Sequence, residues 1–242
     1  MGRYKTFEKI KGIINNIDKK LDSSTTILDY GCGDGKFVKY FLDEKINAYG
    51  CDLKFKKSGI TKSLIKLKKI KLMDSDTFRI PFENEKFDIV ISNQVFEHVA
   101  DYDLAFKEIS RVLKKEGISL NFFPSRYRFI EAHVNVPFAS IIKNKYWLYI
   151  WSLFGFYAKV PNRTLWEIAC RNEIYLKTRT NYLPKKNIRK ISQKHFRYVD
   201  FYEREIINYL EVSRRYYLLK KIFLLLPSFY STFISRVLFL RK

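Results

Sequence analysis

Three glycines at alternate positions follow an apolar run near the start of the chain. The stretch TTILDYGCGDGKF, residues 25–37, contains Gly31, Gly33 and Gly35. The apolar, β-branched run is typical of a buried strand, and the segment after the glycines is expected to be helical. A glycine-rich turn between a strand and a helix cradles a phosphate, holds a dinucleotide or makes a tight corner. The neighbouring residues decide between these alternatives.

Strands and helices alternate over the first half of the chain. The sequence predicts strands over residues 25–30, 47–51, 70–73, 87–92 and 118–123. Helices are predicted over residues 36–43 and in a later stretch that Gly117 ends. A preceding helix has one apolar face, formed by Phe7, Ile10, Ile13, Ile14, Ile17 and Leu21. This alternation predicts an α/β fold with a mainly parallel sheet, in which ligands bind at the carboxyl ends of the strands.

The residues around the glycines exclude two common nucleotide sites. A P-loop needs Ser or Thr after the lysine that follows the last glycine, but Gly35-Lys36 is followed by Phe37. The dinucleotide fingerprint GxGxxG fails as well, because Lys36 stands where its third glycine belongs. Asp52 ends the next predicted strand, where a carboxylate can accept hydrogen bonds from two ribose hydroxyls. The turn therefore favours an adenosine-containing ligand without a pyrophosphate.

ILDYGCGDGKF resembles the first motif of class I S-adenosylmethionine-dependent methyltransferases, in which an acidic residue precedes a GxGxG turn. The resemblance continues through AYGCDLK, DTFRIPFENEKFDIVISNQVFEHV and DYDLAFKEISRVLKKEGISLNFFP, and points to the type 11 group of small-molecule methyltransferases. The sequence departs from that group at residues 115–117, where Lys-Glu-Gly replaces Pro-Gly-Gly in an expected surface turn. The resemblance implies a Rossmann-like fold, S-adenosyl-L-methionine as cofactor and S-adenosyl-L-homocysteine as product.

The resemblance also implies a domain organisation. Residues 1–24 form an N-terminal helix, and residues 25–124 form the cofactor-binding core. Residues 125–242 supply an aromatic-rich elaboration that covers the substrate pocket and completes the sheet, ending in a basic and apolar tail.

Residue roles follow from this resemblance and from the cofactor's chemistry. Gly31 and Gly33 are expected to let the backbone approach the methionine part of the cofactor without a Cβ clash. Asp29 is expected to bind or orient the ammonium group. Asn93 and Gln94, just past a strand end, are expected to line the methionine and the transferred methyl.

The same resemblance implies the adenosine contacts. Asp52 is expected to hold the ribose hydroxyls, with Leu53 against the adenine face. Asp76 is expected to accept the adenine amino group, and Thr77 offers a backbone donor to the ring. Asp74 is the rival for the role of Asp76, and the spacing to residues 81–82 favours Asp76.

Transfer of a methyl group to a hydroxyl requires a base near the methyl. His98, in NQVFEHV, is either that base or a structural cap of the next helix. His133, after the last core strand, is the preferred base, and Glu131 beside it could orient or replace it. His195 is expected at the surface. Glu97 corresponds to a metal-binding glutamate of some quinone-precursor methyltransferases, but no second or third ligand is evident, so no metal is predicted.

The segment FPSRYRFIEAHVNVPFASI loosely resembles the post-core segment of bacterial methyltransferases encoded with surface-polysaccharide genes. Arg126 and Arg128, with Tyr127 between them, are expected to bind the substrate, since guanidinium groups suit phosphate oxygens. The resulting hypothesis is O-methylation of a sugar, or of a phosphate-type modification on one, in capsule or lipopolysaccharide assembly. The acceptor is then a small molecule or glycan of anionic character.

Three alternatives stay open: a lipid or quinone methyltransferase, an RNA methyltransferase and a cofactor-binding module without turnover. The net charge of +21 would attract phosphates, nucleic acid or an anionic membrane. Nucleic acid is the less favoured partner, because SNQV stands where many base N-methyltransferases have an NPPY-like tetrad. The intact first motif argues against a non-enzymatic module.

Two apolar segments bear on location. Residues 146–158, YWLYIWSLFGFYA, form either packed helices or a lid over the acceptor. The tail over residues 222–240 carries Pro227 and Arg236, which disfavour a spanning helix. It is expected to lie on the inner face of the cell membrane, as a peripheral contact, or to pack on the domain as a helix and a strand.

Cysteine usage bears on the compartment. The three cysteines are Cys32, Cys51 and Cys170, without metal-knuckle or CxxC spacing, so a reducing cytoplasmic compartment is expected. Cys32 and Cys51 are expected to be small apolar fillers beside the cofactor.

Overall fold

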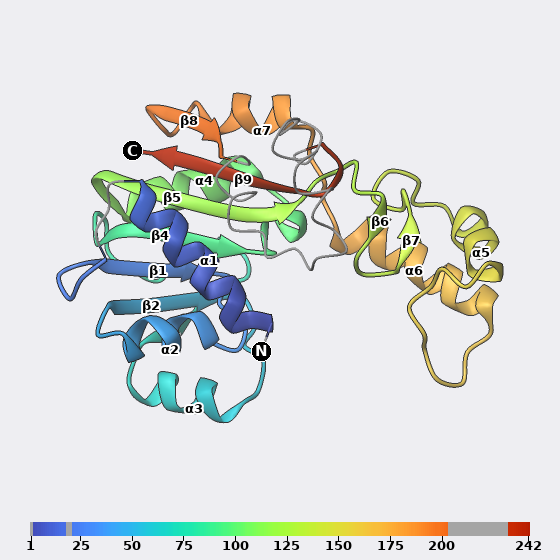
Figure 1. Ribbon diagram of the computed structural model, residues 1–242, viewed down its shortest axis with the longest axis horizontal. Coiled ribbons are helices and arrows are strands. Elements are labelled where there is room, and N and C mark those ends of the chain that lie inside the picture. The colour runs from blue at the N-terminus through green and yellow to red at the C-terminus, as the bar shows by residue number, and fades with distance from the viewer. Residues whose placement is uncertain (1, 18–20, 203–231) are drawn as a thin grey trace, which may run out of the picture.

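A seven-stranded sheet forms the centre of the computed structural model, which describes residues 2–17, 21–202 and 232–242 (Figure 1). The strand order is β3-β2-β1-β4-β5-β9-β8. Pairing is parallel from β3 to β5, whereas β9 is antiparallel to both of its neighbours. The strands are β1 (Thr26–Tyr30), β2 (Asn47–Asp52), β3 (Ile70–Leu72), β4 (Phe87–Asn93), β5 (Leu113–Pro124), β8 (Tyr198–Phe201) and β9 (Ser235–Arg241). The predicted mainly parallel α/β sheet is confirmed.

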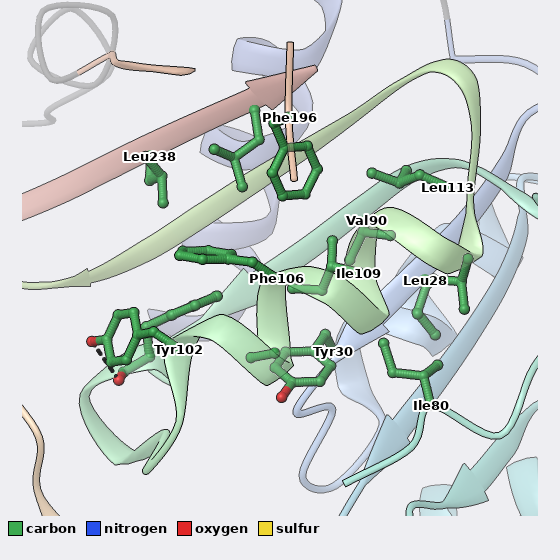
Figure 2. Packing of buried hydrophobic residues seen from close by; sticks show 14 of the residues in the cluster. Leu28, Tyr30, Ile80, Val90, Tyr102, Phe106, Ile109, Leu113, Phe196 and Leu238 are labelled. Atoms are coloured by element: carbon green, nitrogen blue, oxygen red, sulfur yellow. Dashed lines mark hydrogen bonds between the residues drawn. The ribbon is translucent and has the colours of Figure 1, made fainter. Parts of the chain in front are cut away.

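Helices cover both faces of this sheet. One face is covered by α1 (Gly2–Asn16), α2 (Lys36–Asp43) and α3 (Gly59–Lys66), and the other by α4 (Tyr102–Val112) and α7 (Lys185–Ser192). Side chains that alternate along a strand enter opposite cores: Ile27 of β1 packs with the first group of helices, and Leu28 packs with the second. Figure 2 shows the second core, where Phe106 and Ile109 of α4 lie against Val90 of β4.

The N-terminal helix buries the predicted apolar face. Phe7, Ile10, Ile13 and Ile14 are all buried in the first core. The helix ends at Asn16, so Ile17 and Leu21 pack against the core from beyond it.

A small lobe is inserted between β5 and α7. It contains β6 (Ile130–Glu131), β7 (Val136–Pro137), α5 (Lys145–Leu153) and α6 (Leu165–Arg179). Its own core includes Val134, Val136, Ala139, Leu148, Ala169 and Leu176. In Figure 1 the lobe lies beyond the carboxyl ends of β4 and β5, and its α5 contains the first part of the aromatic block. The lobe therefore stands at the edge of the sheet where a ligand is expected.

Several boundaries differ from the prediction. α4 ends at Val112 rather than at Gly117, because Leu113 is drawn into the sheet, pairs with Phe87 and is fully buried. The expected surface turn is an irregularity within β5, where exposed Glu116 has a φ of 59°. The short helix α3 was not predicted, since few apolar residues mark its face.

The described part of the tail completes the sheet. β9 pairs with both β5 and β8, and the Arg236 guanidinium, 2% exposed, donates a hydrogen bond to the Leu183 carbonyl at 2.8 Å. The tail residues before 232, Pro227 included, lie outside the described residues. Within the described ranges, every helix is too short or too polar to cross a membrane.

Candidate cofactor cleft and acceptor pocket

The glycine turn joins β1 to α2 in a left-handed conformation. Gly31, Gly33 and Gly35 have φ values of 77°, 57° and 76°, which residues with a Cβ rarely adopt. A Cβ on Gly31 would lie 2.4 Å from Val95, and one on Gly35 would lie 2.5 Å from Leu64. A Cβ on Gly33 would meet nothing closer than Lys56 at 4.0 Å. Packing thus requires two of the glycines, and the third leaves open space for a ligand.

Asp52 fixes the shape of this turn. One carboxylate oxygen accepts the Gly33 N–H at 2.7 Å, and the other accepts the Lys54 N–H at 3.2 Å. The N–H groups of Gly31 and Cys32 both donate to the Cys51 carbonyl, at 2.8 and 3.0 Å. The end of β2 therefore holds the turn that follows β1, and Asp52 retains lone pairs for a further donor.

A cavity of about 850 Å³ opens at the carboxyl ends of β1, β2 and β4, a size that suits a cofactor or drug-sized ligand. It receives Lys56 from the β2–α3 connection and Tyr175, Thr178 and Arg179 from α6 of the lobe. Most of the predicted cofactor residues line it, namely Asp29, Gly31, Cys32, Gly33, Asp52, Leu53, Asn93 and Gln94. The lining residues of α6 were missed, because no local spacing relates them to the strand ends.

Asp76 and Thr77 are not among the residues that line this cavity; Met73 and Phe78 line it on either side of them. The Asp74 carboxylate accepts the N–H groups of Asp76 and Thr77 at 3.0 and 2.7 Å, together with the Thr77 hydroxyl at 2.9 Å. These hydrogen bonds hold the pKa of Asp74 below its ordinary value. The adenine role of Asp76 and Thr77 stays a prediction.

Cys32 and Cys51 are both buried, and of the two only Cys32 lines the cavity. Cys32 is 7% exposed and packs against Gly50, and Cys51 is fully buried in β2. Burial raises the thiol pKa of both residues, so neither is a thiolate at neutral pH. Both are buried side chains, as fillers are, and their expected place beside a cofactor stays a prediction.

Gln94 occupies a strained position at the rim of the cavity. It follows the last residue of β4 and has a φ of 58°, a left-handed conformation that costs free energy for a residue with a side chain. Its N–H donates to the Phe122 carbonyl of β5 at 2.8 Å, which holds this conformation. The arrangement turns Asn93 and Gln94 into the cavity wall, and their contact with the methionine end of a cofactor stays a prediction.

Glu97, His98 and His133 come together where the lobe meets the cavity, although His133 is far from the other two in the sequence. We call this place the acceptor end. Glu97 and His98 belong to the short 3-10 helix η1 (Phe96–His98), and His133 lies between β6 and β7 of the lobe. One side-chain nitrogen or oxygen of each residue lies within 4.8 Å of those of the other two. The centroids of the two imidazole rings are 4.9 Å apart, with the rings edge to face. His98 also lines the cavity. The two predicted base candidates are thus brought together.

Glu97 is 1% exposed, and neither of its carboxylate oxygens has a hydrogen-bond partner among the described residues. Burial raises the pKa of this carboxyl to about 7, although the charges of His133 and Arg128 work in the opposite direction. A buried carboxylate without partners is costly, so its position calls for a ligand or a proton.

Glu131 orients His133. Its carboxylate accepts from His133 Nδ1 at 2.5 Å and from the Tyr182 hydroxyl at 2.7 Å. Burial opposes ionisation of Glu131, but these hydrogen bonds outweigh it and hold the Glu131 pKa below its ordinary value. The hydrogen bond to Glu131 raises the pKa of His133. Glu131 therefore has the geometry of an orienting partner, one of the two roles expected for it, and both catalytic roles stay predictions.

The predicted substrate residues Arg126, Tyr127 and Arg128 follow β5 and do not belong to the cavity lining. The positive charge of Arg128 works to lower the pKa of Glu97 and of His133, so Arg128 lies within electrostatic range of both residues. Tyr127 is exposed, and the Arg126 carbonyl accepts the Ser140 hydroxyl within the lobe. His195 lies elsewhere, 2.8 Å from the Asp103 carboxylate.

Comparison with known proteins concerns mainly the core. Residues 28–120 match a family model described as a methyltransferase domain. An uncharacterized methyltransferase of Anoxybacillus flavithermus is 27% identical over 46% of this chain and 51% of its own length. A ubiquinone biosynthesis O-methyltransferase of Pelagibacter ubique is 31% identical over 43% of this chain and 44% of its own length. The chain thus spans about half the length of the curated relatives it matches.

The fold is shared more widely than the sequence. Phosphoethanolamine N-methyltransferase 2 of Haemonchus contortus, solved in complex with S-adenosyl-L-methionine, superposes with a TM-score of 0.54 at 16% identity. The superposition covers 97% of this chain and 52% of that one. The predicted Rossmann-like fold of the class I methyltransferases is confirmed, and residues 28–120 are similar to the methyltransferase-domain family.

Proposed function

We propose that this chain, with its class I fold and its methyltransferase-domain core, is an S-adenosyl-L-methionine-dependent O-methyltransferase. The observation that carries the proposal is the cavity at the strand ends, where the left-handed glycine turn is held by Asp52. The open space beside Gly33 and the acidic groups of Asp29 and Asp52 fit a cofactor with an amino acid end and a ribose.

When bound, the cofactor would supply a methyl group activated on a sulfonium. The chain's residues would position it: Asp52 holds the ribose hydroxyls, Asp29 orients the ammonium group, and Asn93 and Gln94 enclose the methionine end. Because methyl transfer is an in-line displacement, alignment of the acceptor contributes much of the rate. His133, held by Glu131, is the group proposed to take the proton from an acceptor hydroxyl.

The proposed acceptor is an anionic small molecule or glycan, namely a sugar or a phosphate-type modification on one in capsule or lipopolysaccharide assembly. Arg128 supports an anionic acceptor, because its charge acts on the same groups that form the acceptor end. Arg126 and Tyr127 on the same loop are proposed to contact the remainder of the substrate. A cytoplasmic location would give access to nucleotide-linked sugars.

A lipid or quinone acceptor at the membrane surface is the second candidate. The lobe exposes large apolar side chains, with Tyr146 and Leu153 each 59% exposed and Phe154 73% exposed. Aromatic and aliphatic side chains of this kind suit the interface of a bilayer, and the positive net charge favours anionic headgroups. The relative from Pelagibacter ubique acts in ubiquinone biosynthesis, as its name states. RNA is a less favoured acceptor.

Titration calorimetry with S-adenosyl-L-homocysteine tests the cofactor assignment. The Asp52→Asn variant is expected to bind at least about tenfold more weakly, because the amide cannot accept both the turn N–H and the ribose donors. Asp43→Asn is the matched control, since Asp43 ends α2 in a surface ion pair with Lys39. Equal affinities of Asp52→Asn and the wild type would contradict the assignment.

Labelled methyl transfer to a panel of acceptors then tests the reaction. Purified surface glycans and nucleotide sugars are expected to take up label, whereas uptake only by quinone precursors or lipids would favour the second candidate. Uptake only by RNA would refute both.

A further inference from the structure

We propose that Glu97, His98 and His133 form a binding site for a divalent transition-metal ion at the acceptor end of the cleft. The three residues offer one carboxylate and two imidazoles, and one ligand atom of each lies within 4.8 Å of the others. Two ligands that are both bound to Zn²⁺ stand about 3.4 Å apart at tetrahedral angles. Small side-chain rotations would close the difference.

The buried carboxylate is the first argument for an ion. Glu97 is 1% exposed, and among the described residues neither carboxylate oxygen has a hydrogen-bond partner. Removing an ionised carboxylate from water without a partner costs far more than burying a neutral amide or hydroxyl. A bound cation would provide a partner for one or both of these carboxylate oxygens. It therefore explains why this side chain is tolerated in the interior.

The hydrogen bonds of the two histidines are the second argument. His98 Nδ1 lies 2.7 Å from the Arg179 carbonyl, and His133 Nδ1 lies 2.5 Å from the Glu131 carboxylate. Both acceptors lack protons to give, so each Nδ1 carries the hydrogen and each Nε2 keeps its lone pair. Histidines that ligate a metal are commonly oriented in this way by a carbonyl or a carboxylate behind them.

The donor set selects the kind of ion. Imidazole nitrogens suit Zn²⁺, Fe²⁺, Co²⁺ and related ions, whereas Mg²⁺ and Ca²⁺ prefer an all-oxygen set. Three protein ligands leave at least one coordination position open, as in catalytic rather than structural zinc sites. His98 lines the cavity, so an open position on that side would face the bound acceptor.

The role of the ion rests on the proposed function, although the existence of the site does not. An acceptor hydroxyl bound to the ion would release its proton more readily, to solvent water, and would be fixed in position for transfer. With the ion bound, His133 would be a ligand and would not act as the base. Glu131 then acts as a positioning residue through His133. Arg128, whose charge acts on both Glu97 and His133, provides a cationic group for the rest of an anionic acceptor.

Metal binding is measured directly on tag-free full-length protein, without cofactor or acceptor. Chelator-treated protein is titrated with Co²⁺ while its ligand-field absorption is recorded, and then with Zn²⁺ in competition. We expect one ion per chain, and a loss of affinity of about tenfold or more in Glu97→Gln and in His133→Asn. His195→Asn is the matched control, because His195 also contacts a carboxylate but lies outside the cluster.

Circular dichroism and binding of S-adenosyl-L-homocysteine check that each variant is folded. The proposal is overturned if folded wild-type protein binds neither Co²⁺ nor Zn²⁺, if Mg²⁺ competes equally, or if the two cluster variants bind like His195→Asn. The metal titration contains no methyl donor, so its outcome does not depend on whether the protein transfers methyl groups. A failure to bind metal would likewise leave the proposed methyl transfer to be tested by its own assay.

Discussion

Gly31 and Gly155 share a left-handed backbone but differ in their surroundings. Their φ values are 77° and 85°, so alanine is strained at both positions. A Cβ on Gly31 would approach Val95 to 2.4 Å, whereas one on Gly155 would meet nothing within 4 Å. The pair separates the cost of the backbone conformation from the cost of steric overlap at the cofactor turn.

Gly155→Ala is expected to lower the free energy of unfolding by about 1–2 kcal/mol, the cost of a left-handed alanine. Gly31→Ala is expected to cost about 1–3 kcal/mol more, because Val95 or the turn must move. Urea denaturation measures both values. Calorimetry is expected to show weaker binding of S-adenosyl-L-homocysteine only for Gly31→Ala. Similar losses of stability for the two variants would mean that the turn absorbs the added methyl group.

The position of a site residue could be predicted from the sequence where neighbouring residues mark it, and could not where it depends on contacts between distant segments. The turn and Asp52 follow strands that pattern and spacing identify, and the structure places them at one cavity. Asp76 was chosen by spacing alone, and the loop that carries it is shaped instead by the hydrogen bonds of Asp74. Glu97 of the core and His133 of the lobe come within 4.8 Å of each other, and no local sequence pattern predicts such proximity.

Among the elements, α4 holds the connection between β3 and β4. The Glu108 carboxylate accepts the Ile80 N–H at 2.9 Å and pairs with Arg111 at 2.6 Å. Arg111 also donates to the carbonyls of Ile80 and Phe82, at 2.8 and 2.9 Å. Glu108 and Arg111 together form a clamp that fixes the β3–β4 connection, and this connection carries Phe78 into the cavity wall.

The clamp predicts a pH-dependent stability. Partial burial opposes ionisation of Glu108, but Arg111 and the Ile80 N–H outweigh it and hold the Glu108 pKa below its ordinary value. A lowered pKa stabilises the fold above the ordinary value of 4.5, and this contribution disappears as the pH falls through the folded-state pKa. Glu108→Gln is therefore expected to cost about 1–3 kcal/mol at pH 7, and progressively less below pH 4.5.

Urea denaturation at pH 7 and at acidic pH measures this difference. Glu173→Gln is the control, because its pairing with Lys177 on α6 is at the surface, where such pairs contribute little. A difference between Glu108→Gln and the wild type that stays constant with pH would contradict the ionised clamp.

Element boundaries were predictable where strands are apolar and short. β1 and β4 lie within a residue of their expected ranges, because their β-branched, apolar runs have no competing helical pattern. The end of α4 was misplaced, because Leu113 fits the helical spacing equally well and only its pairing with Phe87 assigns it to the sheet. A strand such as β9 was one of two alternatives predicted for the apolar tail, the other being a membrane contact. The sequence could not decide between them, because the neighbour β5 of this strand is distant in sequence.

At the scale of the whole molecule, the lobe combines exposed apolar side chains with a strongly cationic chain. Phe154 is 73% exposed and Trp166 is 40% exposed, on segments that border the same small core. If this surface contacts a bilayer, replacing its exposed aromatic side chains with polar ones is expected to weaken vesicle binding and to leave cofactor binding unchanged.

The double variant Phe154→Ser, Trp166→Ser is expected to reduce flotation with anionic vesicles about tenfold or more, because two interfacial aromatic residues are lost. Leu67→Ser is the control, since Leu67 is 61% exposed at the end of α3, away from the lobe. Unchanged cofactor affinity confirms that the double variant is folded. Equal flotation of all three proteins would contradict a membrane role for the lobe.

The insertion of the lobe between β5 and α7 divides the cavity between two parts of the chain. The turn, Asp52 and Asn93 all come from the core, whereas His133 and the α6 wall come from the insertion. Residues 125–184 therefore form one wall of a cavity whose other wall is built by the core. Changes in residues 125–184 are therefore expected to alter one wall of the cavity without changing the glycine turn or Asp52, which belong to the other wall.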